Sequence, residues 1–265
     1  MADHYNLYEL KQFAATIAEC MDFSLPNNYA PSIGWAVNLL KERMDGAADR
    51  VVLYHADAVG LYIWQKYNNR FAPVYRHTSM SLPFVSTVES VTPVAHASMY
   101  TGLDPAEHGI ETYVRPQLTC DTLYDQLIAA GKKVAILAMA DSTFLHIFKG
   151  RDLDYFEAKN PAEIQEKALE LIAGDQYDLI SIHTFEYDNA AHAFGPESKQ
   201  ALNAVSMEAE VFGTIAEALK KFREKHRILL TYSPDHGQHL TEGGAGAHGS
   251  KLIEDMNVLH FFGTI

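Results

Sequence analysis

Short apolar, β-branched runs alternate along this chain with longer segments whose apolar positions recur at helical spacing. The short runs predict strands over Val51–His55, Lys133–Met139, Asp178–His183, Arg227–Tyr232 and Val258–Phe262, with a weaker strand over Val74–Met80. Helical spacing, caps and stop signals predict helices over Tyr5–Cys20, Ser32–Met44, Thr92–Tyr100, Asp121–Ala130, Pro161–Ala173 and Glu197–Lys225. This alternation is typical of an α/β fold, in which helices cover both faces of a mostly parallel central sheet.

The first part of the chain differs from the rest because its pattern is helical only. We therefore expect residues 1–50 to form an N-terminal helical segment packed on the core. Residues 51–265 are expected to form a single α/β domain, a size that is common for such folds. The sequence contains no internal repeat and no low-complexity segment.

Composition excludes several classes of protein. Apolar residues make up 48% and charged residues 21% of the 265, which is typical of a globular chain and excludes disorder, collagen and coiled coil. The formal charge of −13 repels polyanions, so we expect no long nucleic acid as a partner. The two cysteines, Cys20 and Cys120, lie far apart and fit neither a disulfide scaffold nor a thiolate zinc site.

The sequence predicts no association with membranes. No apolar run approaches the ~18 residues that a transmembrane helix needs. The first ten residues, MADHYNLYEL, lack the basic start and apolar run of a secretory signal. We therefore expect a cytoplasmic location.

Metal-ligating side chains follow the predicted strands. In open α/β sheets, ligands bind beyond the carboxyl ends of the strands, so these residues are expected to converge. They comprise three carboxylates and three imidazoles on four segments: Asp57, Asp188, His192, Asp235, His236 and, in the glycine-rich run GGAGAHG, His248. Mixed Asp and His ligands suit Zn²⁺ or Mn²⁺ better than Ca²⁺ or Mg²⁺, which prefer oxygen alone.

A threonine hydroxyl adds a candidate nucleophile. Thr92 precedes Pro93 at the start of a predicted helix, where negative charge is favoured. Such a position would stabilise both an alkoxide and a phosphate, and metal coordination is one route by which a threonine hydroxyl is activated.

Taken together, these motifs resemble the alkaline phosphatase superfamily, and most of all its type I phosphodiesterase/nucleotide pyrophosphatase branch. The resemblance rests on Asp57 and on the ordered runs SVTP, TGLDPAEHGI, DNAAHAFGP, PDHG and AHG, and covers residues 51–262. It implies two divalent metals, most commonly zinc and in some branches manganese. Asp188, His192 and His248 would hold one; Asp57, Asp235 and His236 would hold the other.

The resemblance further implies that Thr92 is the catalytic nucleophile and forms a phospho-threonine intermediate. The expected function is hydrolysis of a small phosphate ester, either a phosphodiester or a nucleotide-type substrate. Two metals ~4 Å apart would clamp both ends of an in-line displacement.

This chain departs from the family at the nucleophile. Related pyrophosphatases resemble T-F-P-N there, whereas this sequence reads Thr92-Pro93-Val94-Ala95 and lacks the asparagine. Stabilisation of the phosphate charge is therefore expected from the metals or from the Val94 or Ala95 amide. The preference for monoesters or diesters stays open. Large cap insertions are also absent, so the first fifty residues are a candidate cover for the site.

Two other functions remain open at this point. One is a phosphomutase or phosphomonoesterase of the same superfamily, and the other is a non-catalytic, metal-stabilised binding domain. Substrate identity and oligomeric state are also open, with Tyr113, Phe144, Tyr187 and Phe194 as candidate base-stacking residues.

The remaining histidines divide into three groups. Structural roles near the site are expected for His96 and His108. His55, His183 and His239 are interpreted as satisfied core or surface histidines, with a hydrogen bond to a metal ligand as the alternative. No role is assigned to His4, His77, His146, His226 or His260.

Overall fold

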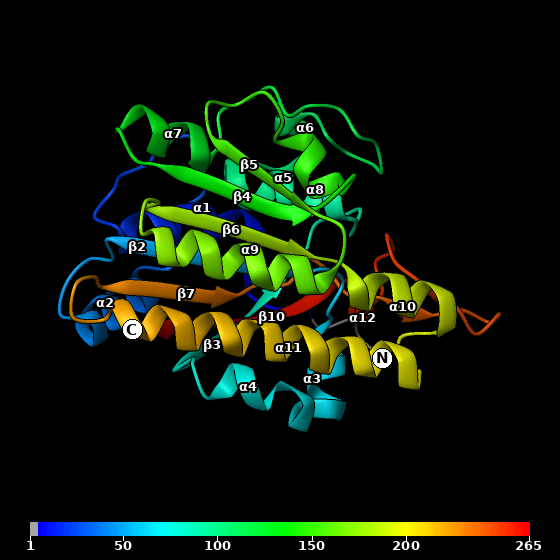
Figure 1. The fold of residues 1–265 in the computed structure, drawn as a ribbon. Coiled ribbons are helices and arrows are strands. Elements are labelled where there is room, and N and C mark those ends of the chain that lie inside the picture. Colours follow the sequence, from blue (N-terminus) through cyan, green and yellow to red (C-terminus); the bar gives the residue numbers. More distant parts are fainter. Residues whose placement is uncertain (1–4) are drawn as a thin grey trace.

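The computed structural model describes residues 5–265 and is built around one central sheet (Figure 1). His4 lies outside the described residues. Eight strands form the sheet in the order β1-β3-β10-β7-β2-β6-β4-β5. In that order they are Tyr8–Glu9, Met80–Val85, Asn257–Thr264, Ile228–Tyr232, Arg50–Ala56, Leu179–Thr184, Val134–Met139 and Asp154–Ala158. Only β10 runs antiparallel to its neighbours, so the sheet is mostly parallel, as the alternating pattern predicts.

Helices cover both faces of the sheet (Figure 1). Side chains alternate between the faces along each strand: Val51 and Leu53 of β2 join one hydrophobic cluster, while Val52 and Tyr54 join the other. The first cluster includes side chains of α1 (Phe13–Cys20), α2 (Gly34–Met44), α5 (Thr92–Thr101), α7 (Leu123–Ala129) and α8 (Thr143–Ile147). The second includes α3 (Leu61–Tyr67), α4 (Ala72–Tyr75), α9 (Pro161–Gly174), α10 (Glu186–Phe194) and α11 (Lys199–Leu219).

Shorter elements complete the described fold. The helices α6 (Pro105–His108) and α12 (Ile253–Met256) and the two-stranded sheet of β8 (His239–Leu240) and β9 (Gly246–Ala247) lie in the loops. Three 3₁₀ turns, η1 (Leu10–Gln12), η2 (Asn68–Phe71) and η3 (Lys220–Phe222), extend neighbouring helices.

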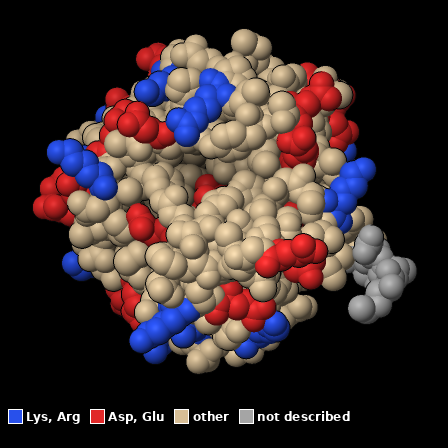
Figure 2. Space-filling model, turned by 90° about the vertical axis from the view of Figure 1, so that its right-hand side faces the viewer, with Lys and Arg blue, Asp and Glu red and all other residues tan. Residues whose placement is uncertain are grey.

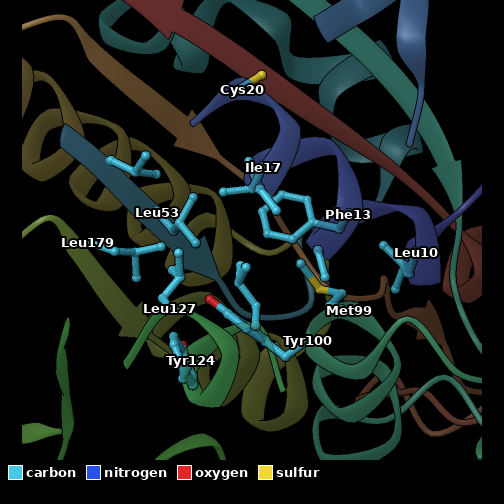
Figure 3. Close-up of a cluster of buried hydrophobic side chains, with 14 of the residues drawn as sticks. Leu10, Phe13, Ile17, Cys20, Leu53, Met99, Tyr100, Tyr124, Leu127 and Leu179 are labelled. Atoms are coloured by element: carbon cyan, nitrogen blue, oxygen red, sulfur yellow. The ribbon is translucent and has the colours of Figure 1, made fainter. Parts of the chain in front are cut away.

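The N-terminal helices share the core of the sheet. Phe13 and Ile17 of α1 are fully buried and belong to the same cluster as Leu53 of β2 (Figure 3). Tyr100 of α5 and Tyr124 of α7 pack against each other in that cluster, with tilted rings whose centroids lie 4.5 Å apart. Burial of this apolar surface attaches the N-terminal helices firmly to the sheet.

Three predicted elements differ from the structure. The strand over Val74–Met80 is wrong: α4 (Ala72–Tyr75) covers its first two residues, and the strand starts only at Met80. Proline fixes φ in the helical range and favours the first turn of a helix, which outweighs the β-branched Val74. The helix expected from Tyr5 starts as β1, because Tyr8 and Glu9 pair with Phe84 and Val85. The helix predicted to Lys225 ends at Leu219 and continues only as η3.

The order of the sheet brings the candidate residues together. β2 lies between β6 and β7 and runs parallel to both, so the carboxyl ends of these three strands meet at one edge. Asp57 follows β2, α10 follows β6, and Asp235 follows β7. Figure 2 views this side and shows a hollow near the centre with acidic atoms at its bottom.

Candidate metal centre

Two clusters of ligand atoms lie at this edge of the sheet. Asp188, His192 and His248 form one; Asp57, Asp235 and His236 form the other. In each cluster one ligand atom per residue lies within 4.8 Å of the others. The structure thus brings together all six residues that the sequence singled out, grouped in the two sets that the resemblance implies.

Local structure explains how each ligand is placed. Asp188 and His192 are one helical turn apart on α10, with the His192 Nε2 atom 3.3 Å from Asp188 Oδ1. The glycine loop that carries His248 passes very close to α10, since a Cβ on Gly246 would lie 2.6 Å from the Ala191 carbonyl oxygen. Glycine is required there, and the close approach brings His248 Nε2 to 2.9 Å from His192 Nε2.

Hydrogen bonds to the backbone orient all three candidate histidine ligands. The Nδ1 atom of His192 lies 3.1 Å from the Gly246 carbonyl oxygen, that of His248 3.2 Å from the Ser90 oxygen, and that of His236 3.0 Å from the Gly237 oxygen. A carbonyl oxygen only accepts, so each Nδ1 carries the proton and each neutral ring presents its Nε2 lone pair to the cluster. This arrangement is typical of histidine ligands to metals.

Thr92 is the first residue of α5, and its side chain faces the second cluster. Its side chain is 6% exposed, and its Oγ1 atom lies 3.2 Å from Asp57 Oδ2 and 3.4 Å from His236 Nε2. Pro93 in the first turn of α5 and the extended Val91 before it fix where the helix begins. The hydroxyl therefore directly faces the second candidate ligand set.

Burial makes the charges of the second set costly. Burial, reinforced by the Asp235 and Asp188 charges, raises the pKa of Asp57 well above its usual range. Burial also raises the pKa of Asp235 to about 7. Carboxylates packed this closely require compensating positive charge in order to ionise together, and a divalent cation supplies it.

The first set has the opposite electrostatic character. Burial opposes ionisation of Asp188, but the nearby His192, His248 and His236 rings outweigh it and lower its pKa. The hydrogen bond to Asp188 raises the pKa of His192. Burial lowers the pKa of His248 to about 4, which leaves that ring neutral and able to bind a metal at neutral pH.

Two buried histidines contact the carboxylates of the second set. His183 Nε2 lies 3.2 Å from Asp57 Oδ2, and His96 Nε2 lies 3.4 Å from Asp235 Oδ2. Neither ring has a well-aligned hydrogen bond among the described residues. The interpretation of His183 as a satisfied core histidine is therefore wrong, and its approach to Asp57, a candidate metal ligand, is closer to the alternative. His55 does have partners, Tyr100 and the Ser233 carbonyl.

A pocket of about 410 Å³ opens above the two clusters. Asp57, Thr92 and the first ligand set line it on one side, and Tyr113, Arg115, Asp141, Ser142, Thr143, Phe185 and Asn189 line other parts. None of its described lining residues precedes Asp57, so residues 5–50 do not cover the site. Of the aromatic candidates, only Tyr113 lines the pocket, whereas Phe144 and Tyr187 are fully buried in the core.

The Val94 and Ala95 amides are not free to stabilise the phosphate charge, contrary to the expectation from the sequence. The amides of Val94 and Ala95 both donate to the Val91 carbonyl, at 3.1 and 3.0 Å, in the first turn of α5. They are therefore already hydrogen-bonded. Asn189, which lines the pocket beside Asp188, offers a side-chain amide instead, and its position in sequence gave no periodic signal that would have identified it.

No protein-family model matches the sequence, and comparison with curated proteins finds no match. Solved structures do match. An inactive variant of murine ectonucleotide pyrophosphatase/phosphodiesterase 5 in complex with AMP superimposes with a TM-score of 0.59 at 16% identity. The alignment covers 74% of this chain and 59% of the murine one, so this chain spans about three-fifths of that protein's length.

Two further structures are comparably similar. The zinc complex of the periplasmic domain of EptC from Escherichia coli gives a TM-score of 0.57 at 16% identity, covering 82% of this chain and 73% of that one. Phosphonoacetate hydrolase from Sinorhizobium meliloti 1021 with phosphonoformate gives 0.55 at 15% identity, covering 75% and 59%. Among residues 5–265, no helix is both long and apolar enough to cross a bilayer. The fold expected from the motifs is thus confirmed, and this chain shares an alkaline-phosphatase-like fold with these structures.

Proposed function

We propose that this protein is a metal-dependent hydrolase of small phosphate esters that uses Thr92 as its nucleophile. The observation that carries the proposal is the position of Thr92 Oγ1, 3.2 Å from Asp57 Oδ2 and 3.4 Å from His236 Nε2. This hydroxyl lies at a fixed helix start and faces three potential metal ligands. Such an arrangement suits phosphoryl transfer.

The donor sets fit two divalent cations, most commonly zinc. Three residues would hold each ion: Asp188, His192 and His248 the first, and Asp57, Asp235 and His236 the second. When bound, such ions lower the pKa of a hydroxyl or water and neutralise the charge of a transferring phosphoryl group. Mixed imidazole and carboxylate donors also suit manganese, so metal analysis belongs with the activity measurement.

The chain's own residues perform the remaining functions. Thr92 Oγ1 forms a bond to phosphorus as the bond from phosphorus to the ester oxygen breaks, and the departing alcohol takes up one proton. Water then cleaves the phospho-threonine and regenerates the hydroxyl, which releases a phosphate monoester from a diester substrate or inorganic phosphate from a monoester. The start of α5 stabilises negative charge at Thr92, since the helix dipole is positive at this end.

The pocket supports a small substrate, with a phosphodiester or a nucleotide-type ester as the first choice. Its volume of about 410 Å³ is in the range of small-molecule sites. The AMP and phosphonoformate bound to two of the similar structures are small phosphorus compounds, which supports the same class. We extend the proposal to a cytoplasmic location and to the absence of long nucleic acid and membrane as partners.

The test compares zinc-loaded wild type with Thr92→Ala and Thr92→Ser. Hydrolysis of bis-p-nitrophenyl phosphate and p-nitrophenyl phosphate reports diester and monoester activity. We expect Thr92→Ala to lose at least ~10³-fold in turnover, because it removes the nucleophile, and Thr92→Ser to retain a measurable fraction. Undiminished turnover in Thr92→Ala would refute the assignment.

Two further measurements separate the alternatives. A phosphate monoester released from a diester, or free phosphate released from a monoester, indicates a hydrolase, whereas a rearranged phosphosugar would indicate a mutase. Elemental analysis near zero metal, together with no turnover after loading with zinc or manganese, would contradict a metalloenzyme and leave a binding domain.

A further inference from the structure

We infer that the substrate carries a second oxyanion, a carboxylate or a phosphate, and that Arg115 binds it. The inference rests on the proposed function, because it assigns a substrate class to the same pocket. Its starting observation is that Arg115 is the only lysine or arginine among the residues that line the pocket. The two candidate metal clusters would take one phosphoryl group, and Arg115 supplies a second site of positive charge in the same cavity.

Arg115 is available to a ligand. Its side chain is exposed, and its Nη1 atom donates to the Asp141 carbonyl oxygen at 3.3 Å. Within residues 5–265 no carboxylate lies within ion-pair distance of its guanidinium, although the chain has 34 acidic residues and 21 basic ones. Four of the five guanidinium N–H groups are therefore left for solvent or a ligand, and their planar fork matches an oxyanion.

Hydrogen bonds hold the loop that carries Arg115 against the site. Tyr113 Oη lies 3.4 Å from Thr143 Oγ1 at the start of α8, and both residues line the pocket. Thr112 Oγ1 donates to Glu89 Oε2 at 2.9 Å, which joins the loop to the segment before Thr92. With the Arg115 bond to the Asp141 carbonyl, these contacts fix the loop on two sides, and such pre-organisation reduces the entropic cost of binding.

Asp141 provides an independent test of the charge of the second substrate group. It lines the same part of the pocket and offers its backbone carbonyl to Arg115, while its carboxylate is exposed. A carboxylate at this position repels a bound oxyanion and attracts an ammonium group. If the second substrate group is an oxyanion, removal of the Asp141 charge strengthens its binding, whereas an ammonium group would be bound less well.

The experiment measures binding to the zinc-loaded full chain by calorimetry. Methylphosphonate has one anionic group, whereas phosphonoacetate and phosphonopropionate add a carboxylate at two distances and propylenediphosphonate adds a second phosphonate. We expect at least one of the longer ligands to bind about tenfold or more tightly than methylphosphonate, the size of one charge-assisted hydrogen-bonded pair. Comparison of the carboxylate and phosphonate ligands identifies which oxyanion is preferred.

Variants locate the source of that preference. Arg115→Gln should bring the affinity ratio close to one, and Asp141→Asn should raise it. Arg223→Gln is the matched control, because it removes an exposed arginine from the turn between α11 and β7, at the amino ends of the parallel strands, and should leave the ratio unchanged. Zinc content and melting temperature, measured on each variant, establish that it is folded.

The outcomes separate this inference from the proposed function. No preference in the wild type, or a preference that persists in Arg115→Gln, overturns the role of Arg115 even when p-nitrophenyl phosphate is hydrolysed. A ratio that falls in Asp141→Asn overturns the choice of an oxyanion. Failure of all four ligands to bind, with no hydrolysis of any ester, contradicts both proposals.

Discussion

The Nε2 atoms of His192 and His248 lie 2.9 Å apart, and the Nδ1 atom of each ring faces a backbone carbonyl oxygen. Since each Nδ1 carries a proton to its carbonyl, the two Nε2 atoms point toward each other, and a proton or a metal ion between them is needed to relieve the repulsion of their lone pairs. Such an arrangement is unfavourable without a positive charge that both nitrogens share, and Asp188 Oδ1, 3.3 Å from one and 3.6 Å from the other, adds a third donor.

This relationship predicts that zinc stabilises the protein and that the gain depends on His248. A ligand that binds only the folded state at 100 times its dissociation constant contributes about 2.7 kcal/mol. Melting curves with zinc and with excess chelator should show a clear difference in the wild type and a much smaller one in His248→Ala. His146→Ala, which removes a histidine outside both candidate ligand sets, is the control and should behave as wild type. An equal zinc effect in His248→Ala would exclude this residue as a ligand.

His183 is predicted to support metal binding at the expense of stability. Its ring is 1% exposed, stacks on Phe144 with a 2° interplanar angle, and contacts Asp57 at 3.2 Å. In His183→Phe, zinc affinity should fall by about 10- to 100-fold, as is usual when a contact to a metal ligand is lost. The metal-free protein should not lose stability, because the buried ring nitrogens disappear. Chelator competition and urea unfolding measure the two effects; unchanged zinc affinity with lower stability would indicate a packing role alone.

Asp255 is predicted to hold together the two loops that carry His236 and His248. Its fully buried carboxylate accepts hydrogen bonds from the Ser250 amide and hydroxyl and contacts His239 Nδ1 at 2.9 Å, while its carbonyl accepts from the Gly237 amide. Removal of one partner from such a network leaves buried donors unpaired, so Asp255→Ala should cost about 3 kcal/mol of unfolding free energy.

The same variant should also weaken zinc binding, because Ser250 follows His248 closely in the loop. Glu254→Ala, at the neighbouring position in α12, serves as the control and is expected to change the free energy of unfolding by less than about 0.5 kcal/mol. A similar loss in both variants would point to the short helix, and not to the buried carboxylate.

Glu208 makes stability depend on pH. Burial raises the pKa of this carboxyl from 4.5 to about 8. It accepts from the Glu186 amide at the start of α10, and Tyr54, Tyr232 and Thr184 of the neighbouring strands surround it. The unfolded chain releases this proton near pH 4.5 but the folded chain retains it, so the free energy of unfolding falls as pH rises from about 5 to about 8.

Glu208→Gln should remove that contribution. Its unfolding free energy, relative to wild type, should increase by up to a few kcal/mol between pH 5 and pH 8, at about 1.4 kcal/mol per unit of pKa difference. Urea unfolding of both zinc-loaded proteins over this range measures the difference, in which effects shared by the two proteins cancel. A difference that is independent of pH would contradict the raised pKa.

The central strands and the residues at their ends were predictable from sequence for a physical reason. β2, β6 and β7 are buried on both faces, so their sequences are mostly apolar, and the polar residues that follow them mark the edge where ligands bind. The i,i+4 spacing of Asp188 and His192 likewise fixes them on one side of a helix. These features depend on residues that are close together in the sequence, and the pattern of a single sequence reports them.

Other features of the fold and of the pocket depend on contacts between distant segments, which local sequence patterns do not encode. Arg115 lies in a loop without periodicity, and its place in the pocket comes from hydrogen bonds to residues of distant segments. The sequence singles out neither Glu208 nor Asp255, and only the packed structure shows that both are buried. The reversed direction of β10 also follows from pairing with β3 and β7 and not from its own sequence.

The order of the strands in the sheet also constrains the stage of folding at which a metal ion can bind. Each candidate ligand set combines segments that are far apart in sequence: Asp57 with Asp235 and His236, and Asp188 and His192 with His248. In an unfolded chain only neighbouring pairs would meet an ion, because closing loops of this length is entropically unfavourable. Zinc is therefore expected to bind after the sheet has formed, so that it slows unfolding without accelerating folding, and the persistence of the native state would be set by how fast the ion dissociates.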